Sequence, residues 1–183
     1  MVLQAIRYTP EGESPAKLEI LDQLLLPHRS VYIPIESSKA AWDAIKQMNI
    51  RGAPAIAIVA ALSLAAELSV EKQGNLSLPT IKDSIFERLT FLESSRPTAV
   101  NLADAVRKLK ATVQKAAGQE GASGDSVANV YIVAAEQMLV ADLKDNEAIG
   151  KHGANWIRDH TNAGRGRVQG NKALKVLTHC NTG

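Results

Sequence analysis

The hexapeptide Arg51-Gly52-Ala53-Pro54-Ala55-Ile56 opens the most apolar segment of the chain. Proline is favoured in the first turn of a helix, where its missing N–H group would have been unpaired, and glycine before it lets another group approach the backbone closely. The hexapeptide therefore predicts a helix that begins at Ala53 or Pro54.

The start of this predicted helix has the chemistry of an anion site. Its first N–H groups and the positive end of its dipole point back towards Gly52, with the Arg51 guanidinium beside them. Phosphate is the anion that such sites most often hold. A second interpretation stays open, in which Arg51 only pairs with a nearby carboxylate and Gly52 makes a turn between two helices.

The residues after Pro54 predict a helix that is covered on all sides. Its apolar side chains are spread round the whole circumference, namely Ile56, Ile58, Val59, Leu62 and Leu64. The apolar run 53–66 ends at Glu67 and is short for a bilayer span of roughly 20 residues. We therefore expect a core helix and no membrane partner.

The composition fits one globular domain, or one domain and part of a second. Of the 183 residues 45% are hydrophobic, and 21 basic residues nearly balance 19 acidic ones. This balance does not indicate nucleic acid as a partner. No secretory signal pattern is visible at the N-terminus, so an intracellular protein is expected. The single cysteine, Cys180, excludes an internal disulfide and a multi-cysteine zinc site.

Three short strands are predicted at the start of the chain, over residues 2–8, 17–24 and 31–35. Turn sequences rich in proline and glycine separate them. This arrangement predicts a small antiparallel sheet. Pro34 cannot donate a hydrogen bond to a neighbouring strand, so it places the third strand at an edge or ends it early.

Helices follow the strands. Ser37 or Ser38 caps the first, the hexapeptide opens the second, the third covers residues 79–93, and a fourth follows Pro97.

Two more helices are expected, one from Asp125 or Ser126 and a shorter one capped by Asp145. We therefore predict an α+β domain over residues 1–160, made of a small antiparallel sheet plus a helical bundle.

An arginine also stands directly before a proline in Arg96-Pro97-Thr98-Ala99-Val100-Asn101, at another predicted helix start. Two arginines at two helix entrances can converge on one phosphate, which guanidinium groups bind directionally. In the alternative interpretation Arg96 caps the preceding helix, because cations are favoured near helix C-termini. The sequence leaves both open.

The C-terminal stretch predicts a linker followed by a strand. Residues 161–172 are polar and glycine-rich, as in a flexible connector. An apolar strand from Ala173 leads into His179-Cys180-Asn181-Thr182-Gly183, and in open α/β folds ligands lie beyond such strand ends. A thiol at that place is expected to react or to stabilise charge. The alternative is that Cys180 is buried and inert.

Three separated blocks, Arg51–Ile56, Arg96–Asn101 and Thr178–Gly183, resemble in order and spacing the signature blocks of the methylthioribose-1-phosphate isomerase family. The likeness covers essentially the whole chain. It implies an enzyme of methionine salvage that converts the aldose 5-methylthioribose 1-phosphate into the ketose 5-methylthioribulose 1-phosphate. No metal and no organic cofactor are implied.

The resemblance also implies a fold. Family members are similar to the regulatory subunits of the eukaryotic initiation-factor 2B complex, with a helical N-terminal domain that carries a small sheet and a Rossmann-like C-terminal domain. They usually form a homodimer. Residues 173–183 are then the first strand of a truncated α/β Rossmann-like domain that is otherwise absent. The expected location is the cytoplasm, with the nucleus as a second one.

Site residues are implied by the matching blocks. The residues expected to bind the sugar phosphate are Arg51, Gly52, Ala53 and Arg96. Cys180 is expected at the reacting end of the sugar, as a catalytic group. The family's catalytic aspartate lies beyond Gly183, so no residue of this chain takes that role.

Two other functions stay open. One is a non-catalytic regulatory subunit related to the initiation-factor 2B complex, which binds a sugar phosphate or a protein without turnover. The other is a ribose-1,5-bisphosphate isomerase, which needs a second phosphate site.

Overall fold

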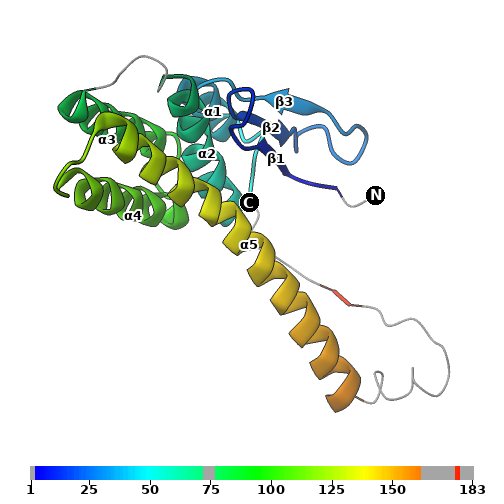
Figure 1. Cartoon of the computed structure of the whole chain (residues 1–183). Helices are drawn as coiled ribbons and strands as arrows, with labels where there is room; N and C mark the ends of the chain where they lie inside the picture. Colours follow the sequence, from blue (N-terminus) through cyan, green and yellow to red (C-terminus); the bar gives the residue numbers. More distant parts are fainter. Residues whose placement is uncertain (1–2, 72–76, 162–175, 178–183) are drawn as a thin grey trace. The chain divides into compact units, whose positions relative to one another are not determined.

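The computed structural model describes residues 3–71, 77–161 and 176–177. In this part of the chain three strands precede five helices (Figure 1): β1 Ile6–Thr9, β2 Lys17–Leu21, β3 Tyr32–Pro34, α1 Ser38–Lys46, α2 Ala53–Glu71, α3 Leu78–Ser94, α4 Val100–Ala117 and α5 Gly124–His160. The chain divides into two compact units, Met1–Met138 and Leu139–Gly183, with the boundary inside α5.

The three strands form the predicted antiparallel sheet in the order β1-β2-β3. Ile6 lies opposite Ile20, and Leu21 opposite Tyr32. Pro34 belongs to an edge strand, as predicted. The central strand ends at Leu21, earlier than predicted, because the chain turns there.

Asp22 makes this turn with its side chain. Its Oδ1 atom accepts a hydrogen bond from the backbone N–H of Leu24 at 3.0 Å, as in an Asx turn. The backbone N–H of Leu25 also donates to the Asp22 carbonyl oxygen. The predicted strand residues 22–24 are therefore the first residues of the β2–β3 loop.

Helix α2 is the predicted core helix. It begins at Ala53, and every residue from 56 to 66 is buried. Ser63 is buried as well, and its hydroxyl donates to the Ala60 carbonyl oxygen of the same helix at 2.9 Å. By length and composition α2 and α5 are both apolar enough to cross a membrane, but 72% of the relevant window of α2 is buried within the fold, against 28% for α5.

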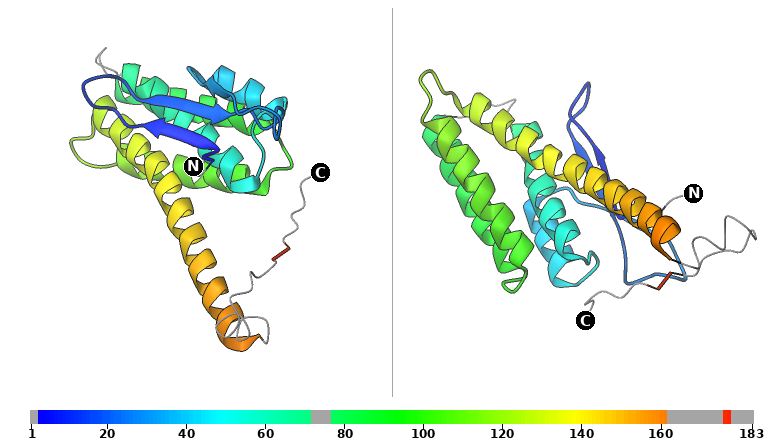
Figure 2. Two further views of the ribbon diagram at one scale, coloured as in Figure 1. Left: turned by 90° about the vertical axis from the view of Figure 1, so that its right-hand side faces the viewer. Right: turned by 90° about the horizontal axis from the view of Figure 1, so that it is seen from below.

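The other elements of the first unit surround α2. Figure 2 shows α2 between the sheet on one side and the pair α3 and α4 on the other. Each of these two helices buries one apolar stripe, namely Ile81, Ile85, Leu89 and Leu92 on α3 and Leu102, Val106, Leu109 and Val113 on α4. Tyr131 of α5 is also buried, and its hydroxyl donates to the Ala61 carbonyl oxygen of α2 at 3.1 Å.

The prediction of two helices after residue 124 is wrong, because α5 continues without interruption to His160. Asp145 lies in the helix interior and caps nothing. Its neighbour Asn146 donates its side-chain amide to the Asp142 carbonyl oxygen one turn earlier, at 2.8 Å. Residues 139–148 contain no proline or glycine, so nothing in them ends a helix.

In the second unit, α5 carries several exposed apolar side chains, namely Val140, Leu143, Ile149 and Trp156. Trp156 stacks on His160 with ring centroids 5.3 Å apart. Of the predicted linker 161–172, only Thr161 is among the described residues. Of the predicted strand 173–183, only Val176 and Leu177 are described, and both are exposed. Both stay predictions.

Alkaline pH is expected to destabilise the first unit through Tyr131. Burial raises the pKa of this phenol above its ordinary value of about 10, so above pH 10 the unfolded chain loses a proton that the folded chain keeps. Stability should then fall by about 1.4 kcal/mol per pH unit from this residue.

At pH 8 we expect Tyr131→Phe to lower the free energy of unfolding by about 1 kcal/mol, because the hydrogen bond is lost. The difference between the two proteins should become smaller towards pH 11, because only the protein with Tyr131 is destabilised by ionisation of that phenol. Urea unfolding followed by circular dichroism at both pH values measures this. The pKa of Tyr8, which burial and its hydrogen bond to Glu136 also raise, is common to both proteins and cancels in the difference. An unchanged difference at pH 11 would contradict the prediction.

Candidate functional site

The N-terminus of α2 has the geometry that the hexapeptide predicts. Gly52 has a φ of +96°, a conformation that other residues rarely adopt, and its carbonyl oxygen accepts the first helical hydrogen bond from the Ile56 N–H at 3.0 Å. Pro54 has no N–H, which leaves Ala53 and Ala55 as backbone donors in the first turn. Gly52, Ala53 and Pro54 are exposed, so this positive helix end faces solvent.

Arg51 is half-buried, and two hydrogen bonds hold it, one from its backbone and one from its side chain. Its backbone N–H donates to Oε1 of Gln23 at 2.7 Å, and its Nε donates to the Met48 carbonyl oxygen at 3.3 Å. Within the described residues Arg51 makes no ion pair with a carboxylate, although Gly52 does lie in the turn between two helices, α1 and α2, as the second interpretation holds. The two terminal nitrogens of the guanidinium keep their donors for another group.

A loop from the sheet supports the segment before α2. The Gln23 backbone N–H donates to the Asn49 carbonyl oxygen at 2.9 Å, and the Asn49 side chain donates to Oδ1 of Asp22 at 3.0 Å. Met48 has a φ of +65°, which is uncommon for a residue with a side chain. The sequence analysis assigned no role to the side chains of Gln23 and Asn49, because the hydrogen bonds that they make join residues far apart in the chain.

Arg96 lies between α3 and α4, three residues before the N-cap Ala99. The prediction that this arginine stands directly before a helix is wrong, because Pro97 belongs to a turn and α4 begins only at Val100. The Arg96 backbone N–H donates to the Glu93 carbonyl oxygen at 3.4 Å, so its backbone extends the end of α3. Its half-buried side chain has no partner within the described residues.

Packing of α1 on the end of α3 links the parts of the chain that lead to Arg51 and Arg96. The indole of Trp42, in the middle of α1, donates to the Ser94 hydroxyl at the end of α3 at 2.9 Å and stacks on Phe91 with ring centroids 5.7 Å apart. Trp42 is thus a packing residue. Arg51 follows α1 by one short loop, and Arg96 follows Ser94 by two residues.

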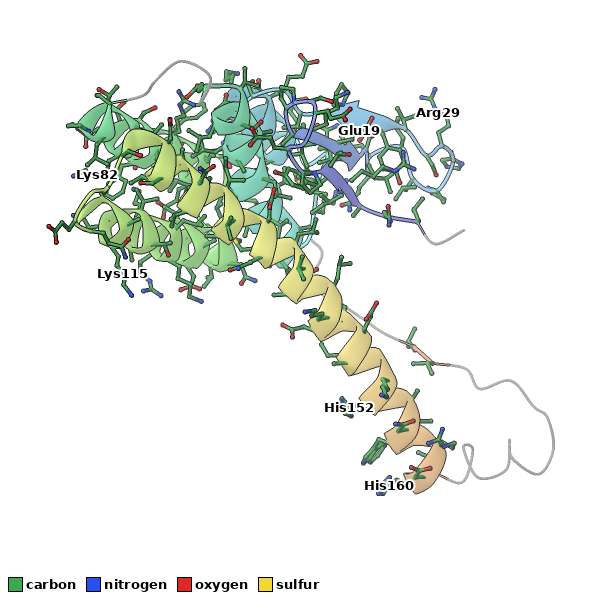
Figure 3. The ribbon with its side chains drawn as sticks, in the orientation of Figure 1. Glu19, Arg29, Lys82, Lys115, His152 and His160 are labelled. Carbon is green, nitrogen blue, oxygen red and sulfur yellow. The ribbon has the colours of Figure 1, made fainter. Side chains whose placement is uncertain are left out.

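Charged contacts elsewhere in the first unit are structural. Glu67 accepts hydrogen bonds from the backbone and hydroxyl of Ser38 and from Arg88, which also pairs with Glu71 at 2.7 Å. These contacts hold the start of α1 and the middle of α3 on α2. Lys115 of α4 is exposed and points away from the fold (Figure 3).

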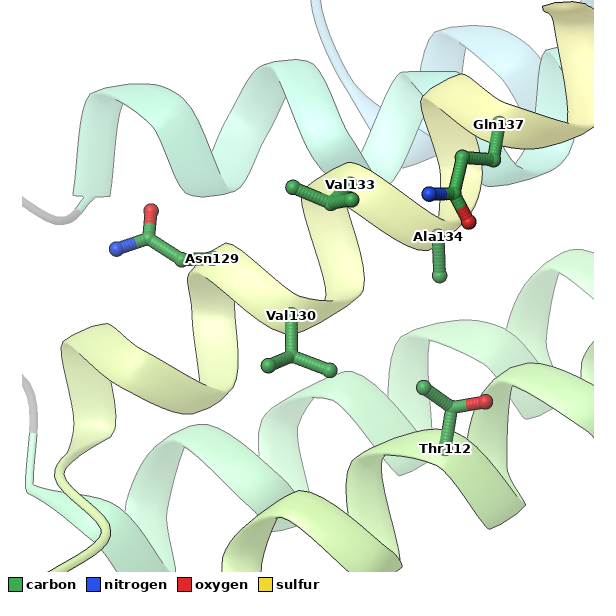
Figure 4. Close-up of a pocket in the computed structure, with 6 residues that line it drawn as sticks. All are labelled: Thr112, Asn129, Val130, Val133, Ala134 and Gln137. Atoms are coloured by element: carbon green, nitrogen blue, oxygen red, sulfur yellow. The ribbon is translucent and has the colours of Figure 1, made fainter.

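A shallow apolar hollow of about 340 Å³ lies between α4 and α5. Figure 4 shows its lining residues, which are Thr112, Asn129, Val130, Val133, Ala134 and Gln137. None of these side chains carries a charge, so the hollow does not have the chemistry of a phosphate site. Cys180, the predicted catalytic residue, lies outside the described residues.

Comparison with known proteins finds relatives that match the whole length of this chain. The family model described as the initiation factor 2 subunit family matches residues 49–183. A curated protein named methylthioribose-1-phosphate isomerase from Pyrenophora tritici-repentis is 54% identical over all of this chain and 44% of its own length. One of the same name from Aspergillus terreus is 50% identical over all of this chain and 46% of its own. The chain thus spans less than half the length of these relatives.

Two solved structures resemble the fold. The crystal structure of 5-methylthioribose 1-phosphate isomerase from Pyrococcus horikoshii OT3 matches with a TM-score of 0.73 and 25% identity, over 84% of this chain and 40% of that one. The structure of translation initiation factor eIF-2B, subunit delta, from A. fulgidus matches with a TM-score of 0.70 and 26% identity, over 87% and 43%.

Replacing Gly52 with alanine should destabilise the start of α2. An added Cβ would meet only the Ala55 Cβ, at 3.9 Å, so the penalty comes from the positive φ and is about 1–2 kcal/mol. Gly118→Ala is the matched control, because Gly118 has an ordinary φ of −88° and its added Cβ would make only ordinary contacts. Urea unfolding should show a control effect within about 0.5 kcal/mol. Equal effects at both positions would contradict the role of Gly52.

Proposed function

Because the chain belongs to the initiation factor 2 subunit family, we propose that it is the N-terminal part of a methylthioribose-1-phosphate isomerase. The observation that carries the proposal is the identity of 50–54% with two proteins of that name across all 183 residues. The fold supports it, because it resembles that of an isomerase of the same substrate from Pyrococcus horikoshii OT3. The enzyme would convert an aldose 1-phosphate into a ketose 1-phosphate.

In this proposal the phosphate of the substrate binds at the N-terminus of α2. Arg51 keeps the donors of its two terminal guanidinium nitrogens and comes two residues before the first residue of α2, whose N-terminal end is exposed. A guanidinium together with a helix N-terminus is an arrangement that binds a doubly charged anion. Arg96 supplies a second guanidinium. Gly52 and Ala53 contribute backbone and no side chain that would exclude the ligand.

The isomerisation itself needs groups for proton or hydride transfer. C1 of the substrate is a phosphate ester, so the ring must open before hydrogen moves between C2 and C1, and the charge that develops must be stabilised. Cys180 is our candidate on one side of the sugar. The partner acid or base lies in the region that the relatives have beyond the matched part.

The same proposal includes the rest of the architecture. Residues 161–172 act as a linker, and residues 173–183 form the first strand of a Rossmann-like domain, whose ligand site then includes Cys180. The complete protein is a cytoplasmic homodimer, with the nucleus as a second location. The resemblance of the three sequence blocks to the isomerase family supports each of these points.

A regulatory subunit is the second candidate function. The likeness to the initiation-factor subunit from A. fulgidus, with a TM-score of 0.70, favours it. Against it stands the much higher identity to proteins named as isomerases. Turnover separates the two candidates directly.

We expect the 183-residue chain alone to be inactive on 5-methylthioribose 1-phosphate. A full-length version, in which this chain is followed by the part of the Pyrenophora relative beyond the match, should form the ketose. Both proteins are assayed for ketose formation at equal concentration. Activity of the short chain would show that the chemical groups lie within it, and inactivity of both would favour the regulatory function.

Arg51→Ala in the full-length version should weaken binding of the substrate by about 10- to 100-fold, because a charge-assisted hydrogen-bond pair to phosphate is lost. Arg96→Ala should act in the same direction. Arg107→Ala is the matched control, since Arg107 is exposed on α4 and pairs with Asp104. Isothermal titration calorimetry measures the three dissociation constants. Unchanged affinity in both Arg51→Ala and Arg96→Ala would overturn the assigned site.

A further inference from the structure

We propose that Gln23 is a positioning residue for the anion site, which fixes the backbone of Arg51 and through it the guanidinium. The inference rests on the proposed function, because it concerns the same site. Gln23 lies in the loop between β2 and β3, 28 residues before Arg51 in sequence.

Two hydrogen bonds of opposite direction join Gln23 to the segment before α2. Its side-chain oxygen accepts from the Arg51 N–H at 2.7 Å, and its own backbone N–H donates to the Asn49 carbonyl oxygen at 2.9 Å. A backbone N–H is only a donor, so the amide of Gln23 must present its oxygen to Arg51. The residue therefore holds the chain on both sides of Ile50, which is completely buried.

The neighbouring aspartate anchors Gln23 to the sheet. Oδ1 of Asp22 accepts hydrogen bonds from the Leu24 N–H and from the Asn49 side chain, both at 3.0 Å. The Asp22 backbone N–H donates to the Val31 carbonyl oxygen at 2.8 Å, which continues the pairing of β2 with β3. Gln23 thus links the paired strand β2 to the loop that carries Arg51.

The loop needs such support because its backbone is unusual on both sides of Arg51. Met48 and Gly52 have φ angles of +65° and +96°. A conformation of this kind at a residue with a side chain persists only when the surroundings enforce it. Because Nε of Arg51 donates to the Met48 carbonyl oxygen, a change in this backbone also moves the guanidinium.

The test is a double-mutant cycle on substrate affinity in the full-length version described above. Gln23→Met keeps the approximate length of the side chain but removes the oxygen that accepts from Arg51. We expect it to weaken binding of 5-methylthioribose 1-phosphate about tenfold, as the loss of one well-placed hydrogen bond does. In the Arg51→Ala background the same substitution should change the affinity by less than about twofold, because Gln23 then has no guanidinium to position.

Two controls separate positioning from general destabilisation. Gln119→Met makes the same chemical change at an exposed residue after α4 and should leave the affinity unchanged. Gln23→Asn, with an amide that is one methylene too short, should give an intermediate loss and replaces Gln23→Met if thermal unfolding shows that variant to be unfolded.

The outcomes are distinct. If Arg51→Ala weakens binding but neither substitution of Gln23 does, the inference is wrong and the proposed function stands. Equal effects of the Gln23 substitution with and without Arg51 also overturn the inference, because they show that Gln23 acts independently. If Arg51→Ala has no effect but Arg96→Ala weakens binding, the inference is wrong, because Arg51 then has no part in binding for Gln23 to support. If neither substitution weakens binding, the anion site of the proposed function is wrong.

Discussion

The burial of α2 on all sides is the constraint on which the first unit depends. Residues 56–66 have no exposed face, because the sheet, α1, α3, α4 and the first part of α5 together cover this helix. Fully burying one aliphatic side chain contributes roughly 1.5–3 kcal/mol, and α2 buries several. A shift or rotation of α2 would disturb all of these contacts together, so its exposed N-terminus at Gly52 is held in place by the core behind it.

Polar contacts then fix the two ends of α2 against the neighbouring elements. Towards the C-terminal end, the Glu67 carboxylate is largely buried and needs donors, which the start of α1 and Arg88 supply. Helix α1 runs back towards the start of α2, and the short loop after it must close a fixed gap. That requirement explains why the loop includes the positive φ angles at Met48 and Gly52, and why a side chain from the sheet holds it.

Sequence periodicity predicted the parts of the fold that depend on local pattern. The buried stripes of α3 and α4 and the start of α2 follow from apolar spacing and from Pro54, because burial of one helix face and the first turn of a helix both have local signals. Asp145 was misassigned because aspartate occurs both at helix caps and on the exposed face of a helix, and the residues next to it in sequence do not distinguish the two. Pro97 was misassigned because proline after arginine occurs in turns as well as at helix starts. The contact of Gln23 with Arg51 has no local signal, since it depends on how the sheet packs beside α2.

The likeness of this chain to both an isomerase and an initiation-factor subunit has a physical explanation in the same terms. The TM-scores of 0.73 and 0.70 are nearly equal, so the fold of this region does not distinguish the two functions. In this fold the N-terminus of α2 is exposed to solvent whichever of the two functions the protein has. The function depends on the side chains at that end of the helix. In the proposed site Arg51 and Arg96 add positive charge and so favour an anionic ligand, whereas catalysis also needs a group that moves hydrogen between two carbons. In the proposed function, binding and chemistry are therefore separable: Arg51 and Arg96 bind the substrate, and turnover needs Cys180 and the further region that the relatives have.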